Sequence, residues 1–236
     1  MRNMTEKYTT ILFDADDTLL DFKKSEKESL TRMLKEYGMP VNETVASRYS
    51  EINASLWREF EKGIITKEDI KRERYSRLFA EFGFDCPVSI MEVNRRYLEL
   101  LSESAYLIDG TVELCSTLKE KGYDLYIITN GIANTQKKRM QISGIDKFFT
   151  RMFISETIGS QKPFREFFNF VFDSIPEKDK RKILVVGDSL GSDIKGAVDS
   201  GLDCVWFNPK HAVNDRGLKI NYEIEKLEEL MSIVEK

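Results

Sequence analysis

Two uninterrupted apolar runs, Leu125–Ile128 and Ile183–Val186, constrain the fold of this chain more than any other feature. A strand that is apolar at every position must be covered on both faces, as in a parallel sheet flanked by helices. Other short segments share the enrichment in β-branched and aromatic residues that is typical of strands. The predicted strands are Tyr8–Phe13, Asp124–Thr129, Met152–Ser155, Lys182–Val186 and Asp203–Phe207.

Helix-length stretches separate these strands and stop at glycines, which adopt the left-handed conformation that ends many helices. These stretches are Thr111–Lys121 before Gly122, Asn134–Ser143 before Gly144, and Ser192–Ser200 before Gly201. Strands that alternate with helices predict an α/β fold with a Rossmann-like, doubly wound parallel sheet. The tail, Tyr222–Lys236, is expected to pack on this core as a final amphipathic helix.

Residues 23–103 follow a different pattern, because they contain no convincing strand and four helical stretches. An insertion of this length is too long for an ordinary loop. We therefore expect a four-helix cap domain at residues 23–103, inserted into a core formed by residues 1–22 and 104–236. Within the cap, Asn42 and Thr66 are predicted helix N-caps, and Pro87 is expected in a first helical turn.

Acidic residues follow the first predicted strand directly. Asp14 and Asp16 are separated by one residue, so both carboxylates can face the same opening if the chain stays extended. The carboxyl ends of strands are where ligands bind in open α/β sheets. One carboxylate can attack a phosphorus atom while the other handles the proton of the leaving group. Asp14 and Asp16 are therefore the predicted nucleophile and acid/base.

Two further segments supply groups that could hold a phosphate. Thr129, Asn130 and Gly131 end the second strand, where a hydroxyl and backbone N–H groups can bind phosphoryl oxygens. Lys162 precedes Pro163, which suits a first helical turn, so this lysine is expected near a helix N-terminus. Either feature alone is also compatible with a turn or a solvated surface. Their significance comes from their combination with the acidic strand ends.

The fourth predicted strand is followed by two more carboxylates, Asp188 and Asp193, on a glycine-containing loop. Carboxylate oxygens are the ligands that Mg²⁺ prefers. A dianionic phosphate 4 Å from one carboxylate would be repelled by roughly 8 kcal/mol at an effective dielectric constant near 20. A divalent cation, together with Lys162, would offset this repulsion. The sequence therefore predicts Mg²⁺ as cofactor.

These four motifs, in this order and at strand ends, resemble the haloacid dehalogenase superfamily, and the helical insertion resembles its type-1 cap. The resemblance implies a sheet with strand order 5-4-1-2-3. It also implies that Asp14 is both nucleophile and metal ligand, and that Asp16 offers its backbone carbonyl to the metal. Thr129 would bind the phosphoryl group, and Lys162 would steady both the nucleophile and the phosphate. Asp188 would ligate Mg²⁺, and Asp193 would contact it directly or through water.

Three segments also resemble one branch of nucleotidases, and this resemblance indicates a class of substrate. The segment Phe13–Phe22, the cap segment Ile52–Trp57 and the stretch Thr129–Gly131 are similar to the branch of 5′-nucleotidases that hydrolyse pyrimidine nucleoside monophosphates. The resemblance therefore implies a small phosphate monoester as substrate. In this interpretation Trp57 could stack on the base, since aromatic stacking contributes roughly 1–3 kcal/mol. A role in helix packing is the alternative for this residue.

Other functions remain open at this stage. Dehalogenation shares an aspartate nucleophile, but it needs no metal, and dehalogenases of the family lack an aspartate at the position of Asp16. Phosphatases or phosphomutases acting on sugar phosphates are a second alternative, although mutases commonly use a cap histidine that is missing here. Phosphonate cleavage would need a cap lysine, for which Lys23, Lys24 and Lys27 are candidates. A non-catalytic metal- or phosphate-sensing regulator is the alternative from another class.

The composition and charge of the chain limit the partners and the cellular compartment that can be expected. The formal charge is −4, with no concentrated basic stripe, so no nucleic acid polymer is expected as partner. No apolar run approaches the roughly 18 residues of a membrane span, so no membrane partner is expected either. The polar N-terminus lacks the apolar centre of a secretory signal, which predicts a cytoplasmic protein. A monomer or a homodimer is expected. The single histidine, His211, has no predicted nucleophile near it.

Overall fold

The computed structural model describes residues 7–235, and these residues form two compact units. The first contains the chain up to Asp21, Leu107–Ala133 and the chain from Ser143 onward; we call it the sheet unit. The second contains Phe22–Tyr106 and Asn134–Ile142; we call it the helical unit. Among the described residues, no helix has the length and apolarity required to cross a lipid bilayer.

The sheet unit is built on six parallel strands in the order β3-β2-β1-β4-β5-β6. The strands are β1 (Thr10–Phe13), β2 (Asp124–Thr129), β3 (Arg151–Ile154), β4 (Ile183–Gly187), β5 (Asp203–Phe207) and β6 (Tyr222–Ile224). Read from its other edge, the sheet has the order β6-β5-β4-β1-β2-β3, so the expected order 5-4-1-2-3 is confirmed for the first five strands. In register, Phe13 of β1 lies opposite Ile127 of β2 and Val186 of β4.

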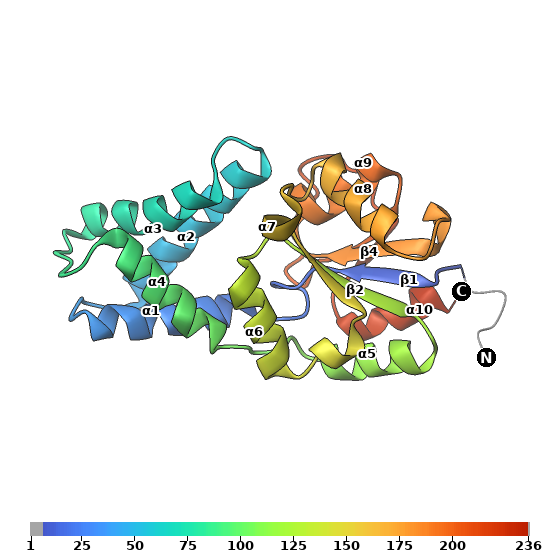
Figure 1. The fold of residues 1–236 in the computed structure, drawn as a ribbon, viewed down its shortest axis with the longest axis horizontal. Helices are drawn as coiled ribbons and strands as arrows, with labels where there is room; N and C mark the ends of the chain where they lie inside the picture. Colours follow the sequence, from blue (N-terminus) through green and yellow to red (C-terminus); the bar gives the residue numbers. More distant parts are fainter. Residues whose placement is uncertain (1–6, 236) are drawn as a thin grey trace. The chain divides into compact units, whose positions relative to one another are not determined.

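Helices cover both faces of this sheet (Figure 1). In Figure 1, α8 and α9 lie on one face, and α5 and α10 lie on the other. The helices that begin and end within this unit are α5 (Thr111–Glu120), α7 (Ser155–Ile158), α8 (Arg165–Ser174), α9 (Lys195–Ser200) and α10 (Leu230–Val234). Leu12, Ile128 and Val185 pack into one buried cluster with α8 and α9. The continuous apolar runs are therefore buried on both faces, as their sequences predict.

The sequence prediction for the C-terminal tail is wrong. Tyr222–Ile224 forms β6, and only Leu230–Val234 forms an α-helix, whereas one helix was expected from Tyr222 onward. The exposed edge of β5 provides the reason, because its unpaired backbone groups need hydrogen-bond partners. The Asn221 side chain accepts a hydrogen bond from the Cys204 N–H (3.0 Å), and the Asn208 N–H donates to Ile224 O (2.7 Å).

Four helices make up most of the helical unit: α1 (Phe22–Glu36), α2 (Glu43–Glu61), α3 (Lys67–Phe82) and α4 (Ile90–Ser102). Asn42 and Thr66 cap α2 and α3 as predicted, and Thr66 forms a capping box with Asp69. The N-cap of α4 is Ser89, so Pro87 lies before the helix and not in its first turn.

Most of α6 (Ala133–Ser143) also groups with the helical unit, although its sequence was assigned to the catalytic core. Its fully buried Arg139 explains this grouping. The Arg139 guanidinium donates from Nε to Ser104 O (3.1 Å) and lies 5.7 Å from the ring centroid of Phe22. Both partners are in segments at the ends of the four-helix insertion, so α6 is tied to them by specific contacts.

A buried polar cluster lies inside the helical unit. The Arg74 guanidinium donates to the Asn94 side chain and lies 4.7 Å from the Tyr97 ring centroid. Asn53 donates to the Glu26 carboxylate over 2.7 Å. The four polar residues are at most 4% exposed, and they come from all four helices. Glu26 interacts electrostatically with Arg74, and removing one of two opposite buried charges leaves the other uncompensated.

Replacing Arg74 by Met should therefore destabilise the protein strongly. The substitution removes a buried cation and leaves Glu26 and Asn94 without it, which should cost about 3–5 kcal/mol. Urea unfolding followed by circular dichroism measures this loss. The matched control is Arg72→Met on the same helix, whose side chain is 58% exposed and should contribute about 0–1 kcal/mol. Equal stability of the two variants would contradict the prediction.

Candidate active site

The tip of β1 positions the first acidic residue. The Asp14 N–H donates to Val186 O over 2.8 Å, which continues the β1–β4 pairing one residue beyond the strand. The chain then turns sharply, because Asp17 adopts a left-handed conformation (φ 56°) and its N–H donates to Leu20 O. Aspartate tolerates this region better than most residues. Asp14 is 6% exposed, while Asp16 is half-buried just before the turn.

A buried lysine joins Asp14 to the other end of the site. The Lys162 Nζ donates to Asp14 Oδ1 (2.6 Å), to Asp193 Oδ1 (2.6 Å) and to the backbone carbonyl of Ile128 (2.9 Å). An ammonium group has three N–H donors, so these acceptors use all of them. Lys162 is 1% exposed and precedes α8 by a short turn.

The loop after β4 carries the remaining carboxylates. Asp188 follows the strand directly, and Asp193 lies on a short π-helical turn, Leu190–Ile194. The Ser189 N–H donates to Asp193 Oδ2 over 3.1 Å. A Cβ atom on Gly187 would lie 2.4 Å from Asp193 Cγ, so only glycine fits at this position. The close approach lets Asp193 turn back toward Lys162.

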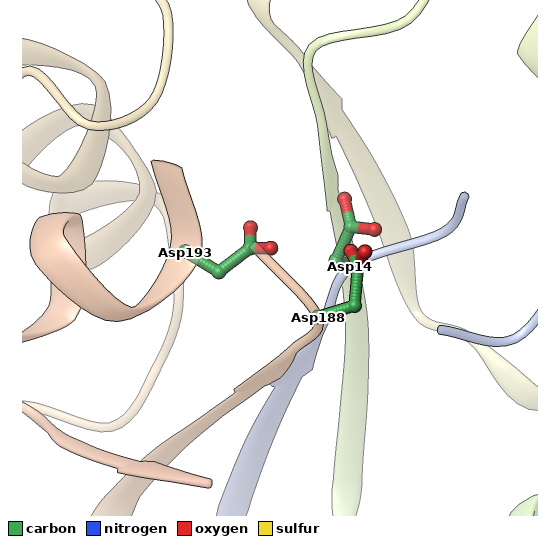
Figure 2. A group of neighbouring side chains, drawn as sticks. All are labelled: Asp14, Asp188 and Asp193. Carbon is green, nitrogen blue, oxygen red and sulfur yellow. The ribbon is translucent and has the colours of Figure 1, made fainter. Parts of the chain in front are cut away.

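Three carboxylates therefore converge (Figure 2). Asp14, Asp188 and Asp193 each offer an oxygen, and these oxygens all lie within 4.8 Å of one another. Figure 2 shows the side chains reaching from the tips of β1 and β4 and from the turn after β4. The group has the all-oxygen donors and the spacing to hold a divalent cation. The Asp16 side chain is not part of this group among the described residues.

The electrostatics of the site also fit a cation. Burial, together with the charges of Asp193 and Asp16, raises the pKa of Asp14 to about 8 against the opposing effect of Lys162. Burial, with the charges of Asp14 and Asp193, also raises the pKa of Asp188 well above its ordinary value. Although burial alone would lower the pKa of Lys162, Asp14 and Asp193 hold it above the ordinary value. With all three carboxyl groups ionised, a single ammonium would leave a buried excess of negative charge, which a divalent cation would neutralise.

The loop after β2 contacts the same lysine. Thr129 is buried, and its Oγ1 accepts a hydrogen bond from the Gly131 N–H (3.0 Å). The Asn130 side chain accepts from the Lys162 N–H (2.9 Å) and donates to Lys162 O (2.9 Å). Trp57 belongs to the helical unit, where it packs edge-on against Phe60. The proposed binding roles of these residues stay predictions.

Two contacts in the site have no counterpart in the sequence analysis. Trp206 lies on β5 and donates from its indole Nε1–H to Asp188 O over 2.8 Å. The strand register carries a signal for this contact, because Trp206 lies opposite Gly187 in the β4–β5 pairing. The double hydrogen bond between Asn130 and Lys162 links two segments far apart in sequence, and no local pattern predicts it.

The Rossmann-like sheet, the acidic residues at its strand ends and the all-helical insertion are features that this chain shares with a known class of hydrolases. The profile of the haloacid dehalogenase-like hydrolase family matches residues 11–207. The chain is also 41% identical to the HAD-hydrolase YfnB of Bacillus subtilis (strain 168), over 97% of this chain and 96% of YfnB. The chain therefore belongs to the haloacid dehalogenase-like hydrolase family.

Other relatives are named for their substrates. Pyrimidine 5′-nucleotidase PynA of Streptococcus pneumoniae is 36% identical, over 97% of this chain and 96% of PynA. Pyrimidine 5′-nucleotidase YjjG of Escherichia coli is 28% identical, over 97% and 98%. A glyceraldehyde 3-phosphate phosphatase of Pyrococcus abyssi is 31% identical, over 95% and 93%. Relatives that cleave phosphate esters support the expectation that this chain is an enzyme of the phosphatase type.

A solved structure matches almost the whole fold. The crystal structure of YfnB bound to magnesium, which reveals interdomain movement in that protein, superposes with a TM-score of 0.92 at 40% identity. The match covers 98% of this chain and all of the YfnB chain. The expected fold class is thereby confirmed. The magnesium ion is bound in the YfnB structure.

Asp14 should make the stability of the metal-free protein depend on pH. Its pKa is raised from 3.8 to about 8, so its contribution to stability is complete below pH 3.8 and is lost as the pH rises through about 8. Thermal unfolding with a chelator present measures this effect at pH 6 and pH 9. Between these values the Asp14→Asn variant should lose about 5–11 °C less in Tm than wild type, because about two pH units of the shift fall within this interval.

The control for this measurement is Asp85→Asn, which makes the same chemical change at an exposed position of the helical unit. Its Tm should fall in parallel with that of wild type. If the Asp14 variant also fell in parallel, burial would not raise the pKa of this carboxyl as described.

Proposed function

We propose that this protein is a Mg²⁺-dependent phosphomonoester hydrolase that acts through an aspartyl-phosphate on Asp14. The observation that carries the proposal is the position of Asp14, a buried carboxylate at a strand end within a carboxylate cluster and held by one ammonium group. Membership of the hydrolase family supports the same reaction class. The expected activity is cleavage of small phosphate esters.

The proposed reaction has two displacement steps at phosphorus. A carboxylate oxygen of Asp14 attacks phosphorus, and the bond to the ester oxygen breaks while Asp16 gives the leaving alcohol its proton. Asp16, now a carboxylate, takes a proton from water, and the resulting hydroxide attacks the same phosphorus. The Asp14–phosphate bond then breaks and releases inorganic phosphate, which restores both carboxyl groups to their starting states. Thr129 and backbone groups of Asn130 and Gly131 would hold the phosphoryl oxygens.

Mg²⁺ is proposed to bind Asp14 and Asp188, with the backbone carbonyl of Asp16 as a further ligand and Asp193 in direct or water-mediated contact. When bound, it would supply positive charge that offsets repulsion between the carboxylates and the phosphate. Lys162 keeps the Asp14 carboxylate oriented through the 2.6 Å contact. Asp14 and Asp193 raise the pKa of Lys162, which favours the charged ammonium form at neutral pH.

Pyrimidine nucleoside monophosphates are the proposed substrates. Two relatives that align over nearly their whole length are named pyrimidine 5′-nucleotidases. Trp57 is the proposed stacking partner for the base. Sugar phosphates form the second candidate class, which the similarity to a glyceraldehyde 3-phosphate phosphatase favours. In both cases the chemistry at Asp14 is the same.

Substitution of the two acidic residues after β1 should separate their roles. Asp14→Asn removes the nucleophile and should lower kcat for an aryl phosphate by about 10³-fold or more. Asp16→Asn should slow both steps by about 10²–10⁴-fold, because the acid and the base are lost together. Steady-state assays with acid quenching of labelled phosphoenzyme measure both effects. Removing the metal with a chelator should abolish turnover in wild type as well.

The exposed Asp85→Asn variant is again the control and should retain wild-type kcat. Substantial turnover by Asp14→Asn would exclude Asp14 as nucleophile. Wild-type turnover by Asp16→Asn would exclude its acid/base role.

A panel of phosphate esters should rank the substrates. If the enzyme is a pyrimidine 5′-nucleotidase, kcat/KM for UMP and dTMP should exceed that for AMP, GMP and glyceraldehyde 3-phosphate by about 10-fold or more, equivalent to about 1.4 kcal/mol in the transition state. Release of inorganic phosphate at equal subsaturating concentrations measures the ratios directly. A preference for glyceraldehyde 3-phosphate would overturn the nucleotidase assignment and leave the reaction at Asp14 intact.

A further inference from the structure

We propose that the Asn130 side chain is a positioning residue for Lys162 and not a direct ligand of the substrate. This inference rests on the proposed function for its kinetic consequences, but its structural basis is independent of the substrate. The Asn130 carboxamide donates from Nδ2 to Lys162 O and accepts at Oδ1 from the Lys162 N–H, each over 2.9 Å. The two hydrogen bonds run in opposite directions between one side chain and one peptide segment.

The pair of bonds reproduces the pattern by which one strand pairs with another. An amide side chain presents a donor and an acceptor side by side, so it can bind both backbone groups of a single residue. Lys162 lies beyond the end of α7 and before α8, where no strand partner satisfies its backbone. Asn130 therefore acts as the missing partner and joins this segment to the end of β2.

The Lys162 side chain makes this attachment important for the reaction. Its ammonium is committed to Asp14, Asp193 and Ile128 O, all within 2.9 Å. Two of these acceptors are on segments that follow β1 and β4, whereas the lysine backbone is held from β2. A shift of the Lys162 backbone by a fraction of an ångström would lengthen all three contacts together, because a lysine side chain already buried has few other rotamers to adopt.

The three contacts of the Lys162 ammonium also predict whether substitution of Asn130 should change kcat or KM. Since every N–H of the ammonium is already donated to the protein, Lys162 contributes to holding Asp14 and to the charge balance more than to ground-state binding of the phosphate. Misplacing it should weaken the transition state and leave substrate binding largely intact. A side chain that bound the phosphate directly would instead change KM and the affinity for inorganic phosphate.

The test is a double-mutant cycle between Asn130→Leu and Lys162→Ala, measured on an aryl phosphate with a good leaving group. Leucine has a similar size but can make neither hydrogen bond. Alone, Asn130→Leu should lower kcat by on the order of 10²-fold, with less than about threefold change in KM or in inhibition by inorganic phosphate. In the Lys162→Ala background the same substitution should cost less than about twofold, because it acts through the lysine that is gone.

The matched control is Asn169→Leu, the same chemical change at an exposed position on α8, and it should leave kcat and KM at wild-type values. If the effects of Asn130→Leu and Lys162→Ala multiply, or if Asn130→Leu raises KM and the phosphate inhibition constant in proportion to its effect on kcat/KM, then Asn130 binds the substrate and the proposal is wrong.

A second measurement needs no activity and so separates this proposal from the proposed function. Hydrogen exchange of the segment around Lys162 reports on its N–H, which is protected by Asn130 in the wild type. Asn130→Leu should speed exchange in the 160–164 segment by about 10-fold or more while exchange in β1 and β4 stays unchanged. Unchanged exchange at Lys162 would overturn the proposal, even if the protein proved to be a phosphatase.

Discussion

The burial of the Lys162 ammonium between two carboxylates is the interaction on which the site depends. A charge removed from water is tolerated only where opposite charge and hydrogen bonds replace the lost solvent. Here Asp14, Asp193 and the Ile128 carbonyl replace it completely. Because Ile128 lies on β2 and the two carboxylates lie on segments that follow β1 and β4, the parallel sheet and its register are what bring these three acceptors together around the lysine. The same contacts then fix the carboxylate that is proposed to react.

The position of this site at one edge of the sheet could be predicted from sequence, for a simple physical reason. Parallel strands end at the same edge, so polar residues that follow apolar runs must meet there. Asp14 and Asp188 follow such runs directly, and the structure brings them together. The order of the first five strands was predictable only through family resemblance, since periodicity identifies strands without ordering them.

Other features depend on tertiary contacts that a local pattern does not contain. Tyr222–Ile224 became a strand because the edge of β5 offered it partners, which overrode the helical interpretation of the tail. The α6 segment has an ordinary helical pattern, yet its buried Arg139 binds Ser104 and groups it with the helical unit. Likewise, Asn130 looked like part of a common Asn-Gly turn, and only the approach of Lys162 gives its side chain a specific partner.

The charge balance of the site distinguishes attack on carbon from attack on phosphorus more sharply than the fold does. Attack on carbon by a single carboxylate needs no compensating cation, and extra buried carboxylates would only add repulsion. This chain has Asp188 and Asp193 within 4.8 Å of Asp14, with a single lysine against the three of them. Burial and the neighbouring carboxylates drive the pKa values of Asp14 and Asp188 upward, so the carboxylate form of the cluster is unfavourable as it stands. A bound divalent cation would favour the ionised state in which Asp14 is proposed to act, and it would also offset the repulsion between the carboxylates and an anionic substrate.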